Sequence, residues 1–284
     1  SRLRKDIAEL SSAFSCAPNG SKILYSYKTN STPGILEILH ECGLGAEVIS
    51  PYELWLAGQL NVSGPNLVYN GTSKTEANLR EAIAQKVHSI NVDSLEELKL
   101  LQKLSHEMKR RVSVGLRLGL ADNTQFGLDV KSGEALAAAK IITSQPQSFS
   151  WTVVHLHTVA NCQHSESHLH YISAALDFLR TVKRELNIEV PYLDIGGGLG
   201  VPTVKVMSRA DYAWYRLFGT LPRRPDSESS ERPERYLFNI VDFIGEYCTR
   251  HDMQMPKLIL EPGRVVVSRA EILLTRVNDI KPKS

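Results

Sequence analysis

The chain has 284 residues, of which 42% are hydrophobic and 23% are charged, and this composition supports a large core and excludes wholesale disorder. Its 33 basic and 31 acidic residues leave a formal charge of +2, which argues against a nucleic-acid partner. The sequence holds no apolar run of about 18 residues, the length that suggests a membrane span, and its N-terminus lacks the apolar stretch of a signal peptide.

The cysteines are scattered along the chain and form no CxxC pair. This pattern predicts free thiols in a reducing compartment, and therefore a cytoplasmic protein. The cysteines are Cys16, Cys42, Cys162 and Cys248.

Short β-rich runs alternate with amphipathic helical segments along the whole chain. The runs are mostly apolar and β-branched, as expected for strands that are covered on both faces. Their alternation with helices predicts a parallel sheet, and eight such units predict a closed (β/α)₈ barrel, with an open doubly wound sheet as the alternative. The predicted strands are residues 23–28, 46–50, 66–70, 89–93, 112–118, 151–157, 192–197 and 257–263.

Two of the helical segments, residues 94–110 and 168–186, have a regular apolar stripe. The first begins with Ser94 three residues before Glu97, which is the spacing of a capping box. The stripes consist of Leu95, Leu98, Leu101 and Leu104 in the first segment, and of Ile172, Leu176 and Leu179 in the second.

Two other segments interrupt the alternation of strands and helices. Residues 219–235 are rich in proline, serine and charge, which predicts an exposed, mobile insertion between the seventh strand and its helix. Residues 265–284 have the pattern of extended β structure. The predicted domains are therefore a barrel over residues 1–264 and the start of an incomplete C-terminal β domain over residues 265–284.

Reactive side chains fall where the predicted strands end. In a (β/α)₈ barrel the active site lies at the C-terminal ends of the strands, so this placement predicts one shared site. In chain order the residues are Lys28, Ser50, Glu53, Asn70, Asp93, Arg117, His157, Gly196, Gly197, Gly198, Glu261 and Arg264.

The run LDIGGGLG at residues 193–200 predicts a phosphate site. It is not a dinucleotide fingerprint, because GxGxxG would need glycine where the chain has Val201. Its three consecutive glycines lack Cβ atoms, so their backbone N–H groups can approach an anion closely. Arg264 would supply a forked cation to the same anion, whereas a tight turn without a ligand is the structural alternative.

Lys28 and Glu261 extend this phosphate site to a pyridoxal phosphate site. A lysine amine in a barrel mouth can form a Schiff base with an aldehyde cofactor. A carboxylate beside a pyridine nitrogen keeps that nitrogen protonated, which strengthens the ring as an electron sink. Lysine, phosphate cradle and carboxylate together therefore predict pyridoxal 5'-phosphate as the cofactor.

The motifs that carry these residues resemble, in the same order, those of a known enzyme family. They are YSYKTN, AEVISPYELWLA, NVDSLEEL, the stretch from RLGL to QFG, HLHTVANC, LDIGGGLG and LILEPGR. Over nearly its whole length the chain resembles the fold-type III pyridoxal-phosphate decarboxylases that act on ornithine, arginine and diaminopimelate. The resemblance implies an alanine racemase-like barrel with a C-terminal β domain, and a homodimer with active sites at the subunit interface.

The resemblance also implies a role for each matching residue. It places the stacking of an imidazole on the cofactor ring at His157, and it places Glu53 near the lysine and Arg117 in the cofactor network. It assigns phosphate binding to Gly196, Gly197, Gly198, Gly263 and Arg264.

The implied reaction is decarboxylation of a basic or dibasic amino acid through a Schiff base on Lys28 and a quinonoid intermediate. Three features depart from the family pattern. Val159 and Ala160 replace the usual Gly-Ser after the stacking histidine, and the insertion at residues 219–235 is long for the family. The chain also ends before the family's C-terminal cysteine, aspartate and tyrosine motifs.

Two alternative functions follow from the sequence. A metal-dependent barrel hydrolase would use His155 and His157, because alternate residues of a strand point to the same side and imidazoles bind zinc. A regulatory homologue would keep the fold and lose the chemistry, and the loss of the family hydroxyl at Ala160 favours this reading.

Overall fold

The computed structural model describes residues 1–121, 125–158, 160–202, 208–220 and 230–270. Eight parallel strands close into a barrel in the order β1-β2-β3-β4-β5-β7-β8-β9, with β9 pairing with β1. This confirms the predicted (β/α)₈ barrel and excludes the open sheet. The strands are β1 Lys22–Ser26, β2 Gly45–Val48, β3 Leu67–Tyr69, β4 Ser89–Val92, β5 Val112–Gly119, β7 Phe149–His155, β8 Tyr192–Asp194 and β9 Lys257–Leu260.

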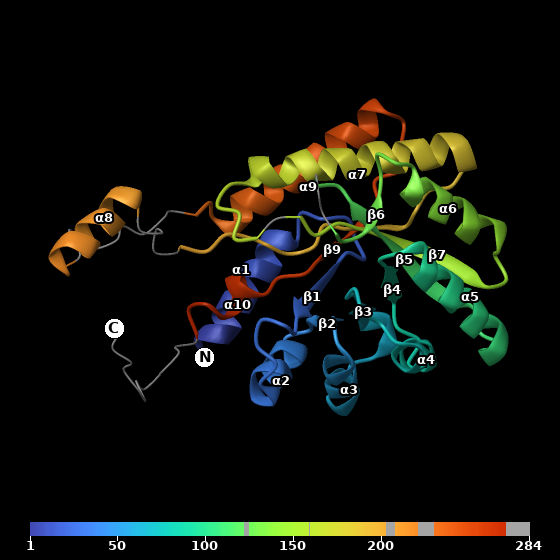
Figure 1. Cartoon of the computed structure of the whole chain (residues 1–284), viewed down its shortest axis with the longest axis horizontal. Helices are drawn as coiled ribbons and strands as arrows, with labels where there is room; N and C mark the ends of the chain where they lie inside the picture. The colour runs from blue at the N-terminus through green and yellow to red at the C-terminus, as the bar shows by residue number, and fades with distance from the viewer. Residues whose placement is uncertain (122–124, 159, 203–207, 221–229, 271–284) are drawn as a thin grey trace.

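Helices cover the outside of the barrel (Figure 1). A short strand, β6 Leu128–Asp129, pairs only with the end of β5 and lies outside the barrel ring. The helices are α1 Arg2–Phe14, α2 Pro33–Glu41, α3 Pro51–Gln59, α4 Glu76–Ala84, α5 Leu95–Met108, α6 Glu134–Ser144, α7 Ser165–Leu186, α8 Arg209–Phe218, α9 Pro233–Arg250 and α10 Arg264–Val267, with a 3₁₀ turn at Gly64–Asn66.

The two apolar stripes predicted from periodicity lie on buried helix faces. The Ser94 side chain caps α5 by accepting a hydrogen bond from the Glu97 N–H at 3.2 Å. Of the stripe residues, all are buried except Leu95, which is partly buried. Both helices therefore form where amphipathic periodicity predicts them, because each buries its stripe against the barrel.

The inside of the barrel has an apolar layer and, above it, a polar layer. Successive residues of a strand point to opposite faces, so residues two apart share the inward face. On four strands an apolar residue is followed, two positions on, by a buried polar one. The pairs are Leu24 and Ser26, Val68 and Asn70, Val153 and His155, and Ile259 and Glu261. The polar residues lie at the C-terminal strand ends, where parallel strands bring them together.

The structure corrects the prediction for residues 219–235. Residues 221–229 lie outside the described residues, but the C-terminal part of the segment is packed. Glu231 accepts a hydrogen bond from the Ser165 N–H at 2.9 Å and one from Asn239 Nδ2 at 3.0 Å. This carboxylate thereby links the start of α7 to α9. Helix α9 begins at Pro233, inside the segment that was predicted to be an insertion.

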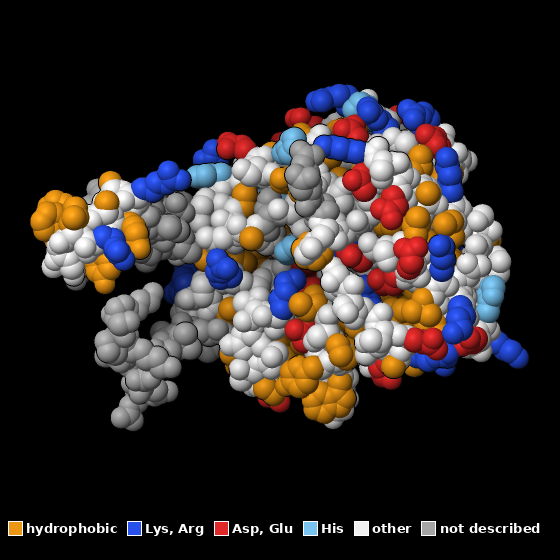
Figure 2. All heavy atoms as spheres, viewed as in Figure 1, with side chains coloured by type: hydrophobic (Ala, Val, Ile, Leu, Met, Phe, Trp, Pro, Cys, Tyr) orange, Lys and Arg blue, Asp and Glu red, His pale blue; other side chains and the backbone are white. Residues whose placement is uncertain are grey.

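Helix α8 was not predicted, and it lies apart from the barrel in Figure 1. No residue of α8 is buried. Orange side chains gather on this helix in Figure 2, and Trp214 contacts Phe218 with ring centroids 4.4 Å apart. The exposed large hydrophobic side chains of α8 are Tyr212, Trp214, Tyr215, Leu217 and Phe218.

The segment after β9 differs from the expected extended structure. Residues 264–267 form the short helix α10, whose Val266 and Val267 are buried, and α10 packs against α1. Burial of the two valine side chains stabilises this turn. Residues 271–284 lie outside the described residues, so a C-terminal β domain over 265–284 stays a prediction.

The structure also bears on the predictions about thiols and membranes. All four cysteines carry free thiols, as predicted, and only Cys248 is buried. Within the described ranges, no helix is both long enough and apolar enough to cross a bilayer.

His168 lies in α7 and is buried. Its Nδ1 and Nε2 atoms lie 3.2 Å from the Tyr236 hydroxyl and 3.0 Å from the Ile195 carbonyl oxygen. Burial is the main cause that lowers the pKa of His168 to about 4. The neutral imidazole of His168 therefore contributes to the packing of α7 against α9.

Replacing His168 by glutamine is expected to change how stability depends on pH. A histidine whose pKa is lowered on folding stabilises the protein fully above its unfolded pKa, and this contribution is lost as the pH falls towards 4. The free energy of unfolding of the wild type, relative to His168→Gln, should therefore fall by about 2 kcal/mol between pH 7 and pH 4.5. Urea denaturation of both proteins at the two pH values measures this difference, and an unchanged difference would contradict the buried neutral imidazole.

Candidate functional site

Lys28 lies two residues after β1 and points to a buried carboxylate. Its Nζ atom is 3.2 Å and 3.4 Å from the two carboxylate oxygens of Glu47. Burial alone would lower the pKa of Lys28, but Glu47 and Glu261 outweigh it, and the pKa of Lys28 is raised. The amine is therefore held in place by Glu47 while its side chain remains 37% exposed.

Glu47 is fully buried on β2, and sequence reasoning did not identify it. Its carboxylate accepts hydrogen bonds from the Ser26 hydroxyl, from Lys28 and from Asn70 Nδ2. An isolated buried carboxylate is costly, so its partners make this position tenable. The signal in the sequence is an acidic residue inside the short apolar run AEVIS, where a fully buried strand would otherwise have no reason to carry a charge.

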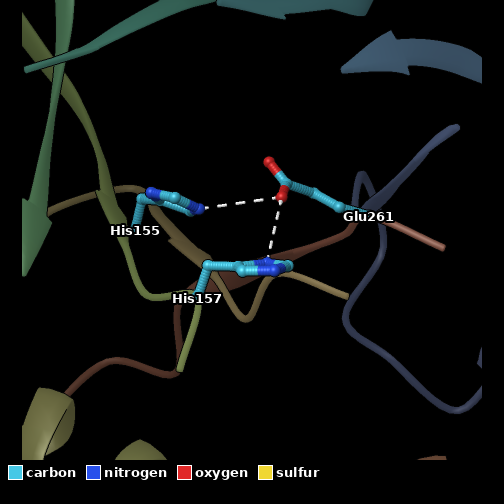
Figure 3. A group of neighbouring side chains, drawn as sticks. All are labelled: His155, His157 and Glu261. Carbon is cyan, nitrogen blue, oxygen red and sulfur yellow. Dashed lines mark ion pairs between the residues drawn. The ribbon is translucent and has the colours of Figure 1, made fainter. Parts of the chain in front are cut away.

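Glu261 follows β9 directly, and one oxygen of its carboxylate points toward two imidazoles (Figure 3). Its Oε2 atom is 3.6 Å from His155 Nε2 and 3.9 Å from His157 Nδ1. Burial by itself would raise the pKa of Glu261, but His155, Lys28 and His157 outweigh burial and lower it well below its usual range. Glu261 is therefore an anion at neutral pH.

Asp194 is a second buried carboxyl in the electrostatic neighbourhood of Glu261. Burial and the charge of Glu261 raise the pKa of Asp194 well above its usual range. One Asp194 oxygen accepts a hydrogen bond from the Gly196 N–H at 2.9 Å. The pKa values of the two carboxyl groups are therefore shifted in opposite directions.

His157 and His155 lie on the same side of the chain, as the HxH spacing predicts. Their rings are stacked with centroids 6.5 Å apart. Burial is the main cause that lowers the pKa of His157 to about 4, and its Nδ1 accepts a hydrogen bond from the Gly197 N–H at 3.4 Å. His157 is therefore neutral at pH 7 and carries its proton on Nε2.

Arg117 lies on β5 next to His155 on β7, in register with it. Its guanidinium group is 3.4 Å from Asp93 Oδ1 and lies over the Phe126 ring, 5.0 Å from the centroid. Asp93 also accepts a hydrogen bond from the Gly127 N–H at 3.0 Å. Asp93 and Phe126 therefore hold the cation at the rim of the site.

Glu53 lies in the first turn of α3, and its carboxylate bonds to the backbone. Its Oε2 atom accepts a hydrogen bond from the Ile49 N–H at 2.7 Å. Burial, the largest effect, raises the pKa of Glu53, and the charge of Lys28 acts in the opposite direction. Glu53 is thus near the lysine electrostatically, but the carboxylate that contacts the amine is Glu47.

The glycine run does not form the simple N–H cradle that the sequence predicts. The Gly196 N–H donates to Asp194 and the Gly197 N–H donates to His157. Gly198 lines the same cavity as Gly263 and Arg264. The anion site with Arg264 therefore stays a prediction, and the Gly196 and Gly197 N–H groups have hydrogen-bond partners within the chain.

The Gly197→Ala substitution is expected to displace Glu261. A Cβ at position 197 would lie 2.2 Å from the Glu261 carbonyl oxygen, so the backbone must move. Overpacking of this kind costs about 1–3 kcal/mol. Thermal unfolding should show this loss, and binding of an anionic aromatic ligand to the site should weaken.

Gly34→Ala is the matched control for Gly197→Ala. A Cβ at Gly34, in α2, meets nothing within 4 Å, and alanine in a helix gains up to about 1 kcal/mol over glycine. Gly34→Ala should therefore be neutral or stabilising. Equal losses in the two variants would contradict the close approach of Gly197 to Glu261.

Two cavities meet at Lys28, His157 and Glu261. One has a volume of about 410 Å³ and extends to Gly198, Gly263 and Arg264. The other has a volume of about 350 Å³ and extends to Arg117 and Phe126. A third cavity, about 630 Å³, lies around the N-terminal ends of β1 and β2, where Lys22 is the charged residue in its lining. The carboxylates of Glu47 and Glu261 thus line the first two cavities.

The side chains of His155, His157 and Glu261 also form a group with metal-ligand character. Their donor atoms lie within 4.8 Å of one another. The sequence favours no metal site, and His155 and His157 are the pair of the alternative metal-hydrolase interpretation; the structure brings this pair together with a carboxylate. These donor atoms are compatible with a divalent metal such as zinc. The same arrangement is equally compatible with an aromatic ligand ring that contacts the carboxylate at its edge and an imidazole on its face.

A comparison with family models identifies the domain. Residues 2–268 match the model described as "Pyridoxal-dependent decarboxylase, pyridoxal binding domain". Among curated proteins, the diaminopimelate decarboxylase of Methanocaldococcus jannaschii is 30% identical over 273 residues, which cover 91% of this chain and 56% of that protein. That of Aquifex aeolicus is 24% identical, with 92% of this chain and 58% of that protein covered.

The solved structures that resemble this chain in fold include a diaminopimelate decarboxylase. The diaminopimelate decarboxylase of M. jannaschii in complex with L-lysine superimposes with a TM-score of 0.77 at 25% identity, covering 93% of this chain and 60% of that chain. A structure described as SrLDC in complex with PLP and cadaverine has a TM-score of 0.68 at 20% identity, with coverage of 93% and 59%. The chain thus spans about three-fifths of the length of the relatives it matches.

Proposed function

The chain belongs to the pyridoxal-dependent decarboxylases and contains their pyridoxal-binding domain, and from this premise we propose that it serves the decarboxylation of a basic or dibasic amino acid. Pyridoxal phosphate is the cofactor of this family. The observation that carries the proposal is the placement of Lys28, His157 and Glu261 around one cavity, with Arg264 at its far end.

The residues present fit the cofactor. The Oε2 atom of Glu261 is buried and has no hydrogen-bond partner among the described residues, as a carboxylate awaiting a ring nitrogen requires. The neutral imidazole of His157 offers a flat apolar face. The cavity that they share contains an amine at Lys28 and a guanidinium at Arg264, which match an aldehyde and a phosphate.

Each of these residues has a distinct task in the proposed reaction. Bound pyridoxal phosphate supplies an electron-withdrawing ring that takes up the electron pair left when a bond to the substrate's α-carbon breaks. Lys28 attaches the cofactor through its amine, which Glu47 orients into the cavity. Glu261 keeps a proton on the ring nitrogen, because its pKa is far below neutral. His157 packs against the ring and carries no charge.

The substrate class is proposed from the relatives. Those relatives are diaminopimelate decarboxylases, and the solved structures carry L-lysine or cadaverine. We therefore expect carbon dioxide release from one member of the panel diaminopimelate, lysine, ornithine and arginine. Labelled carbon dioxide from each substrate is the test, and racemisation without carbon dioxide release would contradict the proposal.

The Arg264→Ala substitution is expected to weaken binding of pyridoxal phosphate without removing the chemistry. Arg264 is the cation that lines the glycine end of the cavity, and a hydrogen bond to a charged group contributes about 1.5–3 kcal/mol. Cofactor affinity should therefore fall by about 10- to 200-fold. Absorbance titration measures it, pyridoxal without phosphate serves as the control ligand, and an unchanged phosphate preference would contradict the assignment.

The assembly proposed from the family resemblance is a cytoplasmic homodimer with active sites at the subunit interface. Light scattering of the purified protein tests the dimer. Mixing two inactive variants tests the shared site, because only an interface site regains activity when each subunit supplies the part that the other lacks.

Two alternatives are kept because a specific observation favours each. A metal-dependent hydrolase would use the group formed by His155, His157 and Glu261. A regulatory homologue would explain why Ala160, which lines the cavity, has no hydroxyl. Metal content and the visible absorbance of the purified protein separate them, because the proposed enzyme carries a coloured cofactor, the hydrolase a metal and the regulator neither.

A further inference from the structure

One amide side chain contacts both buried carboxylates of the site. Asn70 follows β3 and is 4% exposed. Its Nδ2 atom donates to Glu47 Oε1 at 3.0 Å and to Glu261 Oε1 at 2.6 Å. Asn70 therefore lies between the carboxylate that binds Lys28 and the carboxylate that faces the imidazoles.

The side-chain amide of Asn91 fixes the orientation of the Asn70 amide. Asn91 Nδ2 donates to Asn70 Oδ1 at 2.8 Å, and Asn91 Oδ1 in turn accepts from the Ser89 hydroxyl at 2.8 Å. Gly115 on the neighbouring strand makes room for Asn91, since a Cβ there would lie 1.9 Å from its Oδ1 atom. A reversed Asn70 amide would point its oxygen at two carboxylate oxygens, so only one orientation satisfies every partner.

Asn70 is the donor that the two carboxylates share, and each carboxylate has further partners of its own. Glu47 Oε2 accepts from Ser26 and lies nearest to Lys28. Glu261 Oε2 faces His155 and His157. Hydrogen bonds from a neutral donor to a buried anion stabilise the ionised form without adding charge to the site.

We propose that Asn70 is a positioning residue that holds Glu47 and Glu261 in one arrangement, so that a single amide links the lysine end of the cofactor site to its ring-nitrogen end. This inference rests on the proposed function, because it assigns the two ends to one pyridoxal ligand. The side-chain hydrogen bonds of Asn70 go to the two carboxylates and to Asn91, so we infer that it acts through the carboxylates.

The Asn70→Asp variant separates this role from simple packing. Aspartate has the same shape, but it donates a hydrogen bond only when protonated. Burial and two neighbouring carboxylates raise the pKa of such a group, so the variant regains a donor at low pH and adds a third negative charge at high pH. Other charged or titratable groups face the site as well. They include Lys28, Glu53, Arg117, His155, His157, Asp194 and Arg264.

The test is the affinity for pyridoxal phosphate, measured by absorbance titration of the cofactor-free protein at pH 6.0 and pH 8.5. Relative to wild type at the same pH, Asn70→Asp should lose about 10-fold or less at pH 6.0 and about 100-fold at pH 8.5, the scale of hydrogen bonds to charged groups. Asn19→Asp, at an exposed position away from the site, is the matched control and should equal wild type at both pH values.

The outcomes that would overturn the inference are specific. A pH-independent loss in Asn70→Asp, equal to the loss in Asn70→Ala, means that Asn70 only packs. If Asn70→Asp does not fold, Asn91→Ala decides, because it frees the Asn70 amide to reorient and should lower affinity at least several-fold, whereas wild-type affinity contradicts the inference. Failure of the wild type to bind pyridoxal phosphate would instead refute the proposed function.

Discussion

Lys28→Ala is expected to abolish covalent attachment of pyridoxal phosphate and to lower turnover by about 10³-fold or more, the scale on which loss of a covalent catalytic group acts. The amine of Lys28 lies where the two cavities meet and is held by Glu47 at 3.2 Å. Borohydride reduction followed by mass spectrometry measures attachment. The visible absorbance of the protein should be lost at the same time.

The Lys28→Arg variant separates charge from chemistry. Arginine keeps a cation beside Glu47 but has no amine that can add to an aldehyde, so it should preserve stability and still lack attachment. Lys99→Ala, at an exposed position on α5, should behave as wild type. Labelling of Lys28→Ala after reduction would show that another lysine carries the cofactor.

Glu261→Gln is expected to leave the cofactor bound while turnover drops by about 10²- to 10³-fold, the range seen when one electrostatic group of an active site is removed. Glutamine has nearly the same shape and can still accept the hydrogen bond that Asn70 Nδ2 donates at 2.6 Å. It has no negative charge, so it cannot hold a proton on the ring nitrogen. Turnover and cofactor affinity are each measured in this variant and in wild type, so that a loss of turnover is distinguished from a loss of cofactor binding.

Glu261→Asp is the companion variant, because it keeps the charge and shortens the side chain. Partial activity in Glu261→Asp together with deep loss in Glu261→Gln would identify charge as the important property. Full turnover in Glu261→Gln would refute this role for the carboxylate. Removing the charge of Glu261 also removes one cause that raises the pKa of Asp194, so this pKa should fall in Glu261→Gln.

The sequence predicts the framework because each element depends on local patterns. The strands are apolar runs, and the amphipathic stripes of α5 and α7 recur at helical spacing, so the barrel could be derived without tertiary information. The strand-end rule then brought Lys28, His157 and Glu261 to one rim, because parallel strands end on the same side. Helix α8 was missed although its sequence carries an amphipathic pattern and a capping box formed by Ser208 and Asp211. The turn of α10 was assigned to extended structure.

The partners within the site could not be read from the sequence. Glu47 and Glu53 are both acidic and lie six positions apart, and only the inward face of β2 decides that Glu47 meets the amine while Glu53 bonds to backbone. The N–H groups of Gly196 and Gly197 were expected to face an anion, but Asp194 and His157 accept their hydrogen bonds. Such choices depend on which side chains lie within about 3 Å of each other, across strands far apart in the chain.

The sequence by itself determined the fold class, the family and the end of the barrel that carries the chemistry, because hydrophobic periodicity and motif order are local properties of the chain. Only the tertiary structure decided how the pKa values of the site are shifted. Closing the barrel buries Asp194, Glu261 and His157 together, and burial with mutual charge raises the pKa of Asp194 and lowers the pKa values of Glu261 and His157. Desolvation and Coulomb interactions depend on distance in space, and the linear sequence does not contain that distance.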